Sequence, residues 1–585
     1  MLLPSWLIGP FHVDASSCVA LAQHNHDTLR GHFYISMASQ ALQHGGGPAS
    51  VVATGAPPPG CADEAYVQLH DEPASKLHPQ HSFRQHRRIT SSQSMSRLDS
   101  MLHEDQSKAL QPSRVFYVTV AIALLGAIQF GWLMSELNYK QYHIKQICQL
   151  PVPVIDKKYP DYCVLFRGHT HHEWVMTTTA WVVGGGVGAL GSGLPADVLG
   201  RKKGLALNAL LMIAGAIVQA ASGTIHVLTA GRFISGIASG GTINVSNVLI
   251  SEITPLGMRG FFLTGLQVGI SFGVLVVTTV HYGMTSAEMT WRILVGAPLL
   301  IGLLQIALLP CMQESPVWLV AKGKLALAHT SLVNLYLPHD TDVILAELVA
   351  ARTDETSEFT APRRRWTVLF TARYRKQLAV ACVLCAMQQL CGINAIMYYS
   401  ASIFSSIGIH DPRYANTIVA AARMHDILFA AKVLDKFNRR TLLLWGMSTM
   451  AACGGSLVLC LVHGTDSLAQ YGAVGVLVVF VSAYCLSIGP MSWMIANELF
   501  PDYLNARAGA VGTFFTWVSN FFVSVYFPQM ADPANLGNYA FLVFSAFLVA
   551  AVGFTYVCVP ETNHKTYYEI QRAFVIDEPT PTDDR

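Results

Sequence analysis

Long apolar runs recur along most of this chain and constrain its fold more than any other feature. Twelve runs of about 20 residues lie between residues 113 and 560, and a helix of that length can cross the hydrocarbon core of a bilayer. Charged residues make up 13% of the chain, whereas soluble domains average about 25%. Such a chain cannot cover its surface with polar groups, so its solvent must be lipid. The runs are near 115–136, 174–194, 204–222, 228–250, 261–282, 292–311, 376–405, 413–433, 441–462, 470–496, 508–529 and 538–558.

The runs form two sets of six, and the polar stretches around them define the rest of the chain. We expect an all-α membrane protein with one six-helix bundle at 113–311 and a second at 376–559. Residues 312–375 are polar and charged, which predicts a cytosolic linker with short helices. Residues 1–112 are rich in Ser, His, Gln, Gly and Pro, which predicts a disordered cytosolic tail. Residues 560–585 are predicted to be a second cytosolic tail.

A charged motif occurs twice, once in each set of runs and each time directly after an apolar helix. The first copy is Asp197-Val-Leu-Gly-Arg201-Lys202 and the second is Asp435-Lys-Phe-Asn-Arg439-Arg440. A carboxylate and an arginine follow each copy, as Glu252 with Arg259 and as Glu498 with Arg507. Repeated halves are typical of secondary transporters, which bind their substrate between the halves. The repetition therefore predicts a transporter.

The repeated charges have two interpretations. A carboxylate beside an arginine at a helix end can pair with it and with the positive end of a neighbouring helix. Alternatively, the charges are ordinary interfacial residues that fix the topology. Their occurrence at repeated positions favours a gate, in which pairs between the halves hold the cytosolic side closed. The predicted gate residues are Asp197, Arg201, Glu252, Arg259, Asp435, Arg439, Arg440 and Glu498.

Basic residues orient the predicted helices. The basic clusters of the motif loops fall on one side, which the positive-inside rule makes cytosolic, together with both termini. The loop 137–173 departs from this trend because it carries five basic residues on the opposite side. Cys148 and Cys163 flank that loop and can pair if it faces an oxidising space. We expect a multi-pass protein of the plasma membrane or of a vacuolar or other endomembrane.

Amide side chains within the apolar runs are the candidate binding residues. Gln388, Gln389 and Asn394 lie within the run 376–405, where an amide costs several kcal/mol unless it finds a partner. Gln267 adds an amide from the first half. Amides both donate and accept hydrogen bonds, which suits a neutral polyhydroxylated ligand. The alternative is that they join helices to one another.

Two helix interruptions are predicted beside polar residues. Gly392 permits close approach or local unwinding, and Gly489-Pro490 breaks the run 470–496 near mid-membrane. Trp493 follows this break and offers a flat apolar face with one N–H donor, on which a sugar ring can stack. The alternative for Trp493 is an anchor at the membrane interface.

With these motifs, the chain resembles the sugar porter family of the major facilitator superfamily, close to the facilitative glucose and fungal hexose transporters. The resemblance implies that family's fold, with twelve transmembrane helices in two bundles. It also implies sugar contacts at Gln267, Gln388, Gln389, Asn394, Trp493 and Asn520. The matching motifs, in family order, are Gly193-x-x-x-Asp197-x-x-Gly200-Arg201-Lys202, Gly231-Arg232-Phe233, Glu252-x-x-Pro255-x-x-x-Arg259-Gly260, Gln313-Glu314-Ser315-Pro316, Gln388-Gln389-x-x-Gly392-Ile393-Asn394, Asp435-x-x-x-Arg439-Arg440, Gly489-Pro490-x-x-Trp493, Glu498-Leu499-Phe500 and Pro560-Glu561-Thr562.

One departure from the family pattern concerns energy coupling. Proton-coupled members carry an Asp after Phe-Gly-Tyr in the first helix, whereas here Phe130-Gly131-Trp132 is followed by Leu133. The missing carboxylate favours a downhill carrier over a proton symporter. Glu136 lies one turn further and either substitutes for that Asp or is an ordinary residue at the helix mouth.

A second departure lies in the run 413–433. Arg423 stands where the family has a small or amide residue, and a central arginine costs roughly 2.5–3.5 kcal/mol on insertion scales. Asp426, three residues on, is expected to pair with Arg423 on one helical face. Arg423 would then intrude on the sugar site. Three interpretations stay open: a changed substrate, a non-transporting member, or a wrong exon boundary.

The predicted function is transport of a hexose or similar sugar by alternating access, as a facilitative uniporter. The alternatives are a proton-coupled sugar symporter and a non-transporting sugar sensor that signals through its long tail. We expect the partners to be the sugar and the lipid bilayer, and the protein to be a monomer. Neither an enzyme with catalytic residues nor a metal or cofactor site is expected. The net charge of +2 gives no indication of nucleic-acid binding.

Overall fold

The computed structural model describes residues 111–574, apart from residues 144, 159–162, 284–287, 337–340, 343, 347, 351–365, 410, 434–435, 464–466, 501, 564, 566 and 573. Its regular elements are helices, and no strand occurs among the described residues. Most of the predicted N-terminal tail, much of the linker and the last eleven residues lie outside the described part, as does Asp435.

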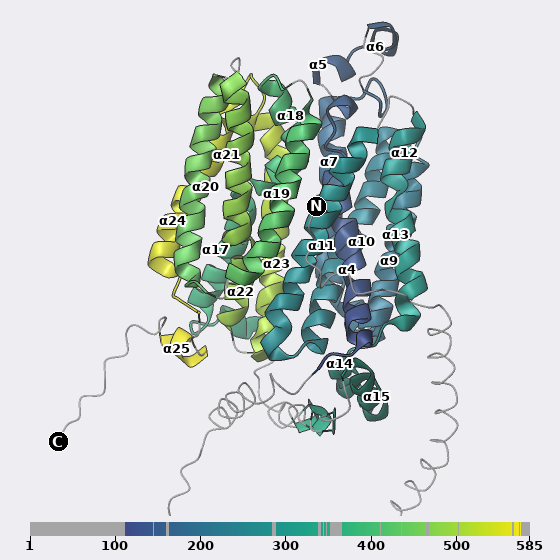
Figure 1. The fold of residues 1–585 in the computed structure, drawn as a ribbon, viewed down its shortest axis with the longest axis vertical. Coiled ribbons are helices and arrows are strands. Elements are labelled where there is room, and N and C mark those ends of the chain that lie inside the picture. Colours follow the sequence, from purple (N-terminus) through teal and green to yellow (C-terminus); the bar gives the residue numbers. More distant parts are fainter. Residues whose placement is uncertain are drawn as a thin grey trace, which may run out of the picture. The chain divides into compact units, whose positions relative to one another are not determined.

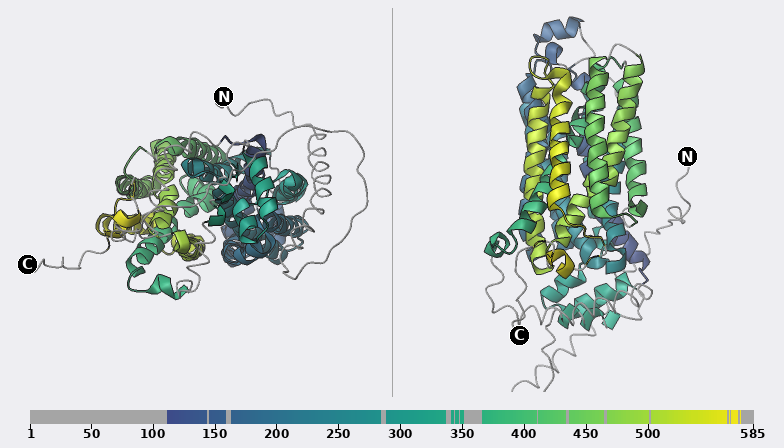
Figure 2. Two further views of the ribbon diagram at one scale, coloured as in Figure 1. Left: turned by 90° about the horizontal axis from the view of Figure 1, so that it is seen from below. Right: turned by 90° about the vertical axis from the view of Figure 1, so that its left-hand side faces the viewer.

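Two helical halves lie side by side, as Figures 1 and 2 show. They contact each other through α11 with α19 and through α7 with α23. The N-terminal half contains α4 (Arg114–Ser135), α7 (His171–Gly191), α8 (Gly193–Leu199), α9 (Arg201–Ala220), α10 (Ile225–Ile253), α11 (Leu256–Val280), α12 (Glu288–Gly296) and α13 (Pro298–Leu308). The C-terminal half contains α17 (Arg375–Leu390), α18 (Ile393–Ser406), α19 (Pro412–Val433), α20 (Arg439–Val462), α21 (Ser467–Leu486), α22 (Ile488–Glu498), α23 (Asp502–Met530) and α24 (Ala540–Cys558).

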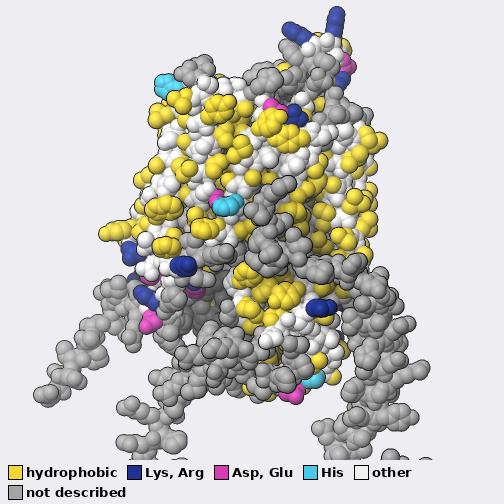
Figure 3. Space-filling view, in the orientation of Figure 1, with side chains coloured by type: hydrophobic (Ala, Val, Ile, Leu, Met, Phe, Trp, Pro, Cys, Tyr) yellow, Lys and Arg dark blue, Asp and Glu magenta, His cyan; other side chains and the backbone are white. Residues whose placement is uncertain are grey.

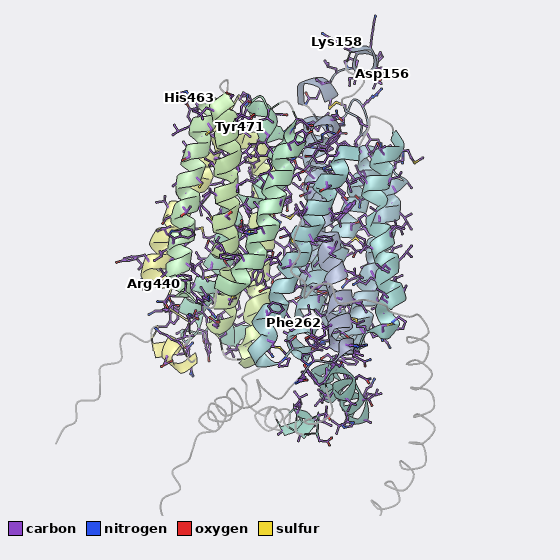
Figure 4. The ribbon with its side chains drawn as sticks, in the orientation of Figure 1. Asp156, Lys158, Phe262, Arg440, His463 and Tyr471 are labelled. Carbon is purple, nitrogen blue, oxygen red and sulfur yellow. A yellow bond between two sulfur atoms is a disulfide. The ribbon has the colours of Figure 1, made fainter. Side chains whose placement is uncertain are left out.

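Short helices mark the two ends of this arrangement (Figure 1). One end, here named the loop side, carries α5 (Lys145–Cys148) and α6 (Val152–Lys158). The opposite end, here named the motif side, carries α14 (Pro316–Ala321), α15 (Leu325–Leu335) and α25 (Tyr567–Arg572). Figure 4 shows Asp156 and Lys158 on the loop side and Arg440 on the outer surface toward the motif side.

The described helices account for the predicted membrane spans. Ten helical stretches are long and apolar enough to cross a bilayer, and the pair α7–α8, bent by 41°, makes an eleventh. The 22-residue helix α19 falls short of that apolarity because it carries Arg413, Arg423 and Asp426. It packs against α11, α18 and α21 and takes the remaining position of the twelve. Hydrophobic side chains are spread over the helical part of the face in Figure 3, and few charged side chains lie among them, as expected of a surface in contact with lipid.

Both predicted helix interruptions are present, but the second lies at Ser487, two residues before the predicted Gly489-Pro490, which are in the first turn of α22. Helix α21 ends at Leu486 and α22 begins at Ile488, with Ser487 in a non-helical conformation (φ −134°, ψ −106°). The break between α17 and α18 lies at Gly392, whose φ is +91°. A Cβ at Gly392 would lie 2.6 Å from Cδ2 of Phe544, so this position requires glycine both for its conformation and for its space.

We therefore expect Gly392→Ala to lower the free energy of unfolding by about 2–4 kcal/mol, the sum of a left-handed alanine and a side-chain clash. Thermal melting of the detergent-purified protein would measure this loss. The control is Gly455→Ala on α20, where an added Cβ meets no atom within 4 Å. A glycine-to-alanine change in an open helix position stabilises by up to about 1 kcal/mol. Equal melting temperatures for the two variants would contradict the prediction.

The predicted cysteine pair is formed. Cys148 and Cys163 make a disulfide on the loop side, with their Cα atoms 5.5 Å apart. The bridge closes the segment that contains α6, and both cysteines are buried with Ile155. This segment connects α4 to α7.

Candidate functional site

Four of the six predicted sugar-contacting residues, all of them amides, form one hydrogen-bonded network. Asn394 Nδ2 donates to Asn520 Oδ1 at 2.8 Å and to Gln389 Oε1. Gln389 Nε2 donates to Gln388 Oε1 at 3.3 Å, and Gln388 Nε2 donates to the carbonyl of Gly489. We name Gln388, Gln389, Asn394 and Asn520 the amide network. It joins α17, α18, α22 and α23, and the break at Gly392 lets the two adjoining helices contribute to it.

An aromatic cluster between the halves adjoins the amide network. The hydroxyl of Tyr398 hydrogen-bonds Asn520, with its oxygen 3.2 Å from Nδ2 and 3.3 Å from Oδ1. Its ring meets Trp181 of the first half edge-on, at 6.3 Å between centroids. Trp181 in turn contacts Trp517 at 6.2 Å and Phe130 at 4.9 Å. Residues from both halves meet in this region. The amide network forms its polar wall, and the aromatic rings supply the flat apolar faces on which a sugar ring can stack.

The two remaining predicted contacts, Gln267 and Trp493, lie outside the amide network, each one helical turn from a buried residue. Gln267 is half-buried on α11, one turn before Ser271, and Trp493 is half-buried on α22, one turn after Gly489. Residues four apart share a helix face, so each lies on a face that reaches the interior. No hydrogen bond joins Gln267 or Trp493 to the amide network within the described residues.

A hydrogen-bonded contact closes the space between the halves on the loop side. Asn138 Nδ2 donates to the carbonyl of Met397 at 3.0 Å and to Ser400 Oγ at 2.7 Å. Its Oδ1 accepts from the backbone N–H of Ala401 at 3.1 Å. We name these four residues the loop-side latch. Small cavities lie on both sides of Asn138, one reaching Asn416 and the other reaching Tyr398.

We expect Asn138→Ala to shift the equilibrium towards a loop-side-open state by about 1–3 kcal/mol, because it removes three hydrogen bonds between the halves. The measurement is the rate at which a water-soluble maleimide labels Ala420→Cys, a buried position that lines the first cavity. Thr178→Val is the matched control, since it removes one contact between the halves, to Tyr399 at 3.3 Å. An unchanged labelling rate in Asn138→Ala would mean that the latch does not hold this side closed.

The motif side carries the predicted charged groups in two similar ion pairs. Arg201 binds Glu252 through two parallel hydrogen bonds, Nε to Oε2 at 2.9 Å and Nη2 to Oε1 at 2.8 Å. Its Nη1 also lies 3.1 Å from Asp197 Oδ1. In the second half, Arg439 pairs with Glu498. Both pairs join elements of the same half, whereas the gate was expected to consist of pairs between halves.

The remaining predicted gate residues are Arg440, Arg259 and Asp435. Arg440 donates to the carbonyl of Tyr556 and lies over the ring of that residue, at 5.5 Å. Arg259 is half-buried near the start of α11. Asp435 is outside the described residues.

Each half also has a glutamate whose carboxylate caps the N-terminus of one helix, which is a further feature that the two halves share. Glu314 Oε1 accepts from the backbone N–H groups of Arg201 at 2.8 Å and Lys202 at 3.2 Å, at the start of α9. Glu561 accepts from Arg439 at 3.0 Å and Arg440 at 3.1 Å, at the start of α20. A carboxylate there satisfies free N–H groups and interacts favourably with the helix dipole. Burial raises the pKa of Glu314 above its usual value, although these hydrogen bonds act in the opposite direction.

A fully buried ion pair lies within the first half. The side chain of Glu136, directly after α4, pairs with Arg232 of α10, and the two side chains are 0% and 4% exposed. Arg232 also donates to the carbonyl of Leu133 at 3.3 Å. Glu136 is thus not an ordinary residue at the helix mouth, but the counter-ion of the arginine in the Gly231-Arg232-Phe233 motif.

The predicted pair between Arg423 and Asp426 is not formed. Asp426 accepts from Ser482 of α21 and lies beside His425, whereas Arg423 donates to Ser271 of α11. Residues three apart on a helix are separated by about 60° around its axis, so two neighbouring helices can engage them separately. The prediction was wrong because it weighed spacing along α19 without the competing partners on α11 and α21.

The chain matches a family model described as "Sugar (and other) transporter" over residues 118–574. The chain belongs to the sugar transporter family. This member of the sugar transporter family is 30% identical over 475 residues to human facilitated glucose transporter member 14, a match that covers 80% of this chain and 89% of the relative. It is 31% identical over 476 residues to mouse facilitated glucose transporter member 4, covering 78% and 90%.

Solved structures show that this sugar transporter family member has the major facilitator fold. The proton:xylose symporter XylE, bound to 6-bromo-6-deoxy-D-glucose, has a TM-score of 0.64 and 21% identity, with 78% of this chain and 98% of that chain covered. The inward-open form of XylE from E. coli has a TM-score of 0.63 and 21% identity, with 78% and 99% covered. The predicted fold class is confirmed, and the family is one of transporters, not of enzymes.

Proposed function

We propose that this protein carries a hexose or a similar sugar through the membrane by alternating access, as a facilitative uniporter. The observation that carries the proposal is the amide network, which supplies both donors and acceptors beside an aromatic cluster shared by the two halves. Polyhydroxylated ligands need this combination. Relatives at 30–31% identity are named as facilitated glucose transporters, which supports the same substrate class.

The proposed cycle uses the two ends of the molecule in turn. Sugar binds between the halves at the amide network, with Gln267 and Trp493 completing the site from neighbouring helix turns. The loop-side latch opens towards one compartment. On the motif side, the ion pairs of Arg201 and Arg439 each stabilise one half while the two halves move relative to each other. Rigid-body rocking of repeated halves about a fixed site is the common mechanism of such folds.

The cellular arrangement is part of the proposal. Because most basic loop residues lie on the motif side, we place that side and both termini in the cytosol. The membrane is then the plasma membrane or a vacuolar or other endomembrane, and the disulfide on the opposite side faces an oxidising compartment. We propose a monomer as the transporting unit.

Uptake of radiolabelled D-glucose into proteoliposomes tests the transport function. We expect saturable uptake that is unchanged by external pH or by a protonophore. A non-transporting sensor would bind the sugar without accumulating it, which an assay of binding alongside flux would detect.

Gln388→Ala is expected to lower sub-saturating uptake by about 5- to 100-fold, because it removes a hydrogen-bonding group from the amide network and leaves its partners unpaired. Initial rates at several sugar concentrations would measure the change. Gln305→Ala is the control, since Gln305 is an equally buried amide that bonds a carbonyl of α4 away from the network, at 3.2 Å. Unchanged uptake in Gln388→Ala would exclude Gln388 from the site.

Proton coupling is the second candidate function, and the buried Glu136–Arg232 pair is the observation that favours it. A carboxylate inside a membrane protein beside an arginine can exchange a proton as its pairing changes. In that case uptake would rise as the external pH falls and would stop with a protonophore. The uniport proposal predicts neither response.

A further inference from the structure

Arg423 is a buried cation for which the described residues provide no counter-ion. It lies on α19 and is 6% exposed. Its Nε donates to Ser271 Oγ at 3.3 Å, while its Nη1 is buried without a hydrogen-bond partner. Within the described residues, no carboxylate lies at ion-pair distance from this guanidinium. A buried charge with an unsatisfied hydrogen-bonding group is costly, so the site is incomplete as it stands.

The carboxylates of the membrane interior are already engaged elsewhere. Asp426, the nearest along the helix, accepts from Ser482 and lies beside His425. Glu136 pairs with Arg232. The protein therefore provides partners for its other interior charges, and Arg423 is left available to a ligand.

The surroundings of Arg423 belong to the proposed sugar site. Its guanidinium lies near enough to the Tyr398 hydroxyl to interact with it electrostatically, and that hydroxyl bonds the amide network through Asn520. Asn416 and Ala420, on the same face of α19, line a small cavity between the halves. Arg423 thus lies on the same face of α19 as two residues that line a cavity between the halves.

We propose that Arg423 binds the carboxylate of a sugar acid, so that the substrate is a hexuronate such as D-glucuronate. The inference rests on the proposed function, because the amide network would hold the sugar hydroxyls while Arg423 holds the acid. A planar guanidinium matches a carboxylate in shape and forms two parallel hydrogen bonds with it. One unpaired cation balances one negative charge, so a sugar phosphate with two charges fits less well.

Counterflow of radiolabelled D-glucuronate in proteoliposomes tests the proposal, with D-glucuronamide as the uncharged ligand of the same shape. In the unmodified protein, we expect D-glucuronate to compete at least about tenfold better than D-glucuronamide, D-glucose or glucose 6-phosphate. Arg423→Gln should weaken D-glucuronate about 10- to 100-fold and leave D-glucuronamide within a factor of about two. Arg423→Lys, which keeps the charge, should retain part of the preference.

Two controls separate a ligand contact from a structural role. Arg413→Gln removes an arginine from the same helix that already pairs with Asp411 at 2.8 Å, and it should leave the preference unchanged. The ligand-induced rise in melting temperature gives a second readout, which for D-glucuronate should disappear in Arg423→Gln. Removal of an unpaired buried charge should not unfold the protein.

The outcomes distinguish this inference from the proposed function. Uptake of D-glucose with no binding of D-glucuronate would overturn the carboxylate site and leave sugar transport standing. Absence of flux for every sugar, with Arg423-dependent binding of D-glucuronate retained, would overturn the transport function and leave the carboxylate site standing. A preference for D-glucuronate that survives Arg423→Gln would remove Arg423 from the site.

Discussion

Replacing Glu136 by glutamine is expected to lower the free energy of unfolding by about 3–5 kcal/mol. The change leaves the guanidinium of Arg232 in the interior with the carbonyl of Leu133 as its remaining acceptor among the described contacts. A buried charge that loses its partner keeps the full cost of leaving water. Thermal melting of the purified protein would measure the loss, which we expect to be the largest of any single substitution considered.

A double replacement tests the cause of this loss. Glu136→Gln with Arg232→Gln removes both charges, so it should recover most of the stability that either single variant loses. The control is Asp156→Asn, which breaks an exposed ion pair with Arg167 and should cost less than about 1 kcal/mol. Additive losses in the double variant would mean that the two groups do not stabilise each other. If Glu136 carries protons, the single variant also makes uptake independent of pH.

Replacing Arg201 by glutamine is expected to cost about 3 kcal/mol and to lower transport at least about tenfold. Arg201 ties the turn between α8 and α9 to the end of α10, and its side chain is 10% exposed, against 15% for Glu252. The variant leaves that carboxylate poorly solvated and frees the turn. Melting temperature and initial uptake rate are the two measurements.

Lys203→Gln is the matched control for Arg201→Gln, since Lys203 lies two residues on and is exposed. It should change neither quantity. Arg439→Gln should reproduce the effect in the second half, because Arg439 pairs with Glu498 as Arg201 pairs with Glu252. A loss of stability without any loss of transport would mean that the pair is structural and has no part in the gate.

The spans and the interior position of Gln388, Gln389 and Asn394 could be predicted from the sequence because both follow from the chemistry of a hydrocarbon solvent, whereas Asn520 was indicated by the family resemblance alone. A run of about 20 apolar residues has few alternatives to a spanning helix. Amides within such a run must find partners, so Gln388, Asn394 and their neighbours were expected to lie inside the bundle. The breaks at Gly392 and Ser487 follow from glycine and proline in the same way.

The contacts between distant segments could not be predicted. Asn138 lies just beyond the first apolar run, and its partners are more than 250 residues away on α18. Glu314 and Glu561 belong to recognised motifs, but their acceptor role depends on where the chain returns after a whole bundle. For Arg423 and Asp426, spacing along one helix was a poor guide because helices on either side offered other partners.

The loop-side latch has a consequence for how easily that side opens. Asn138 bonds the carbonyl of Met397 and the N–H of Ala401, and these two groups are four residues apart. An α-helix joins such groups in its own ladder of hydrogen bonds. When Asn138 withdraws, α18 can satisfy both groups internally, so separation leaves no stranded backbone dipole in the hydrocarbon. The barrier to parting on the loop side therefore falls chiefly on one asparagine that water can solvate.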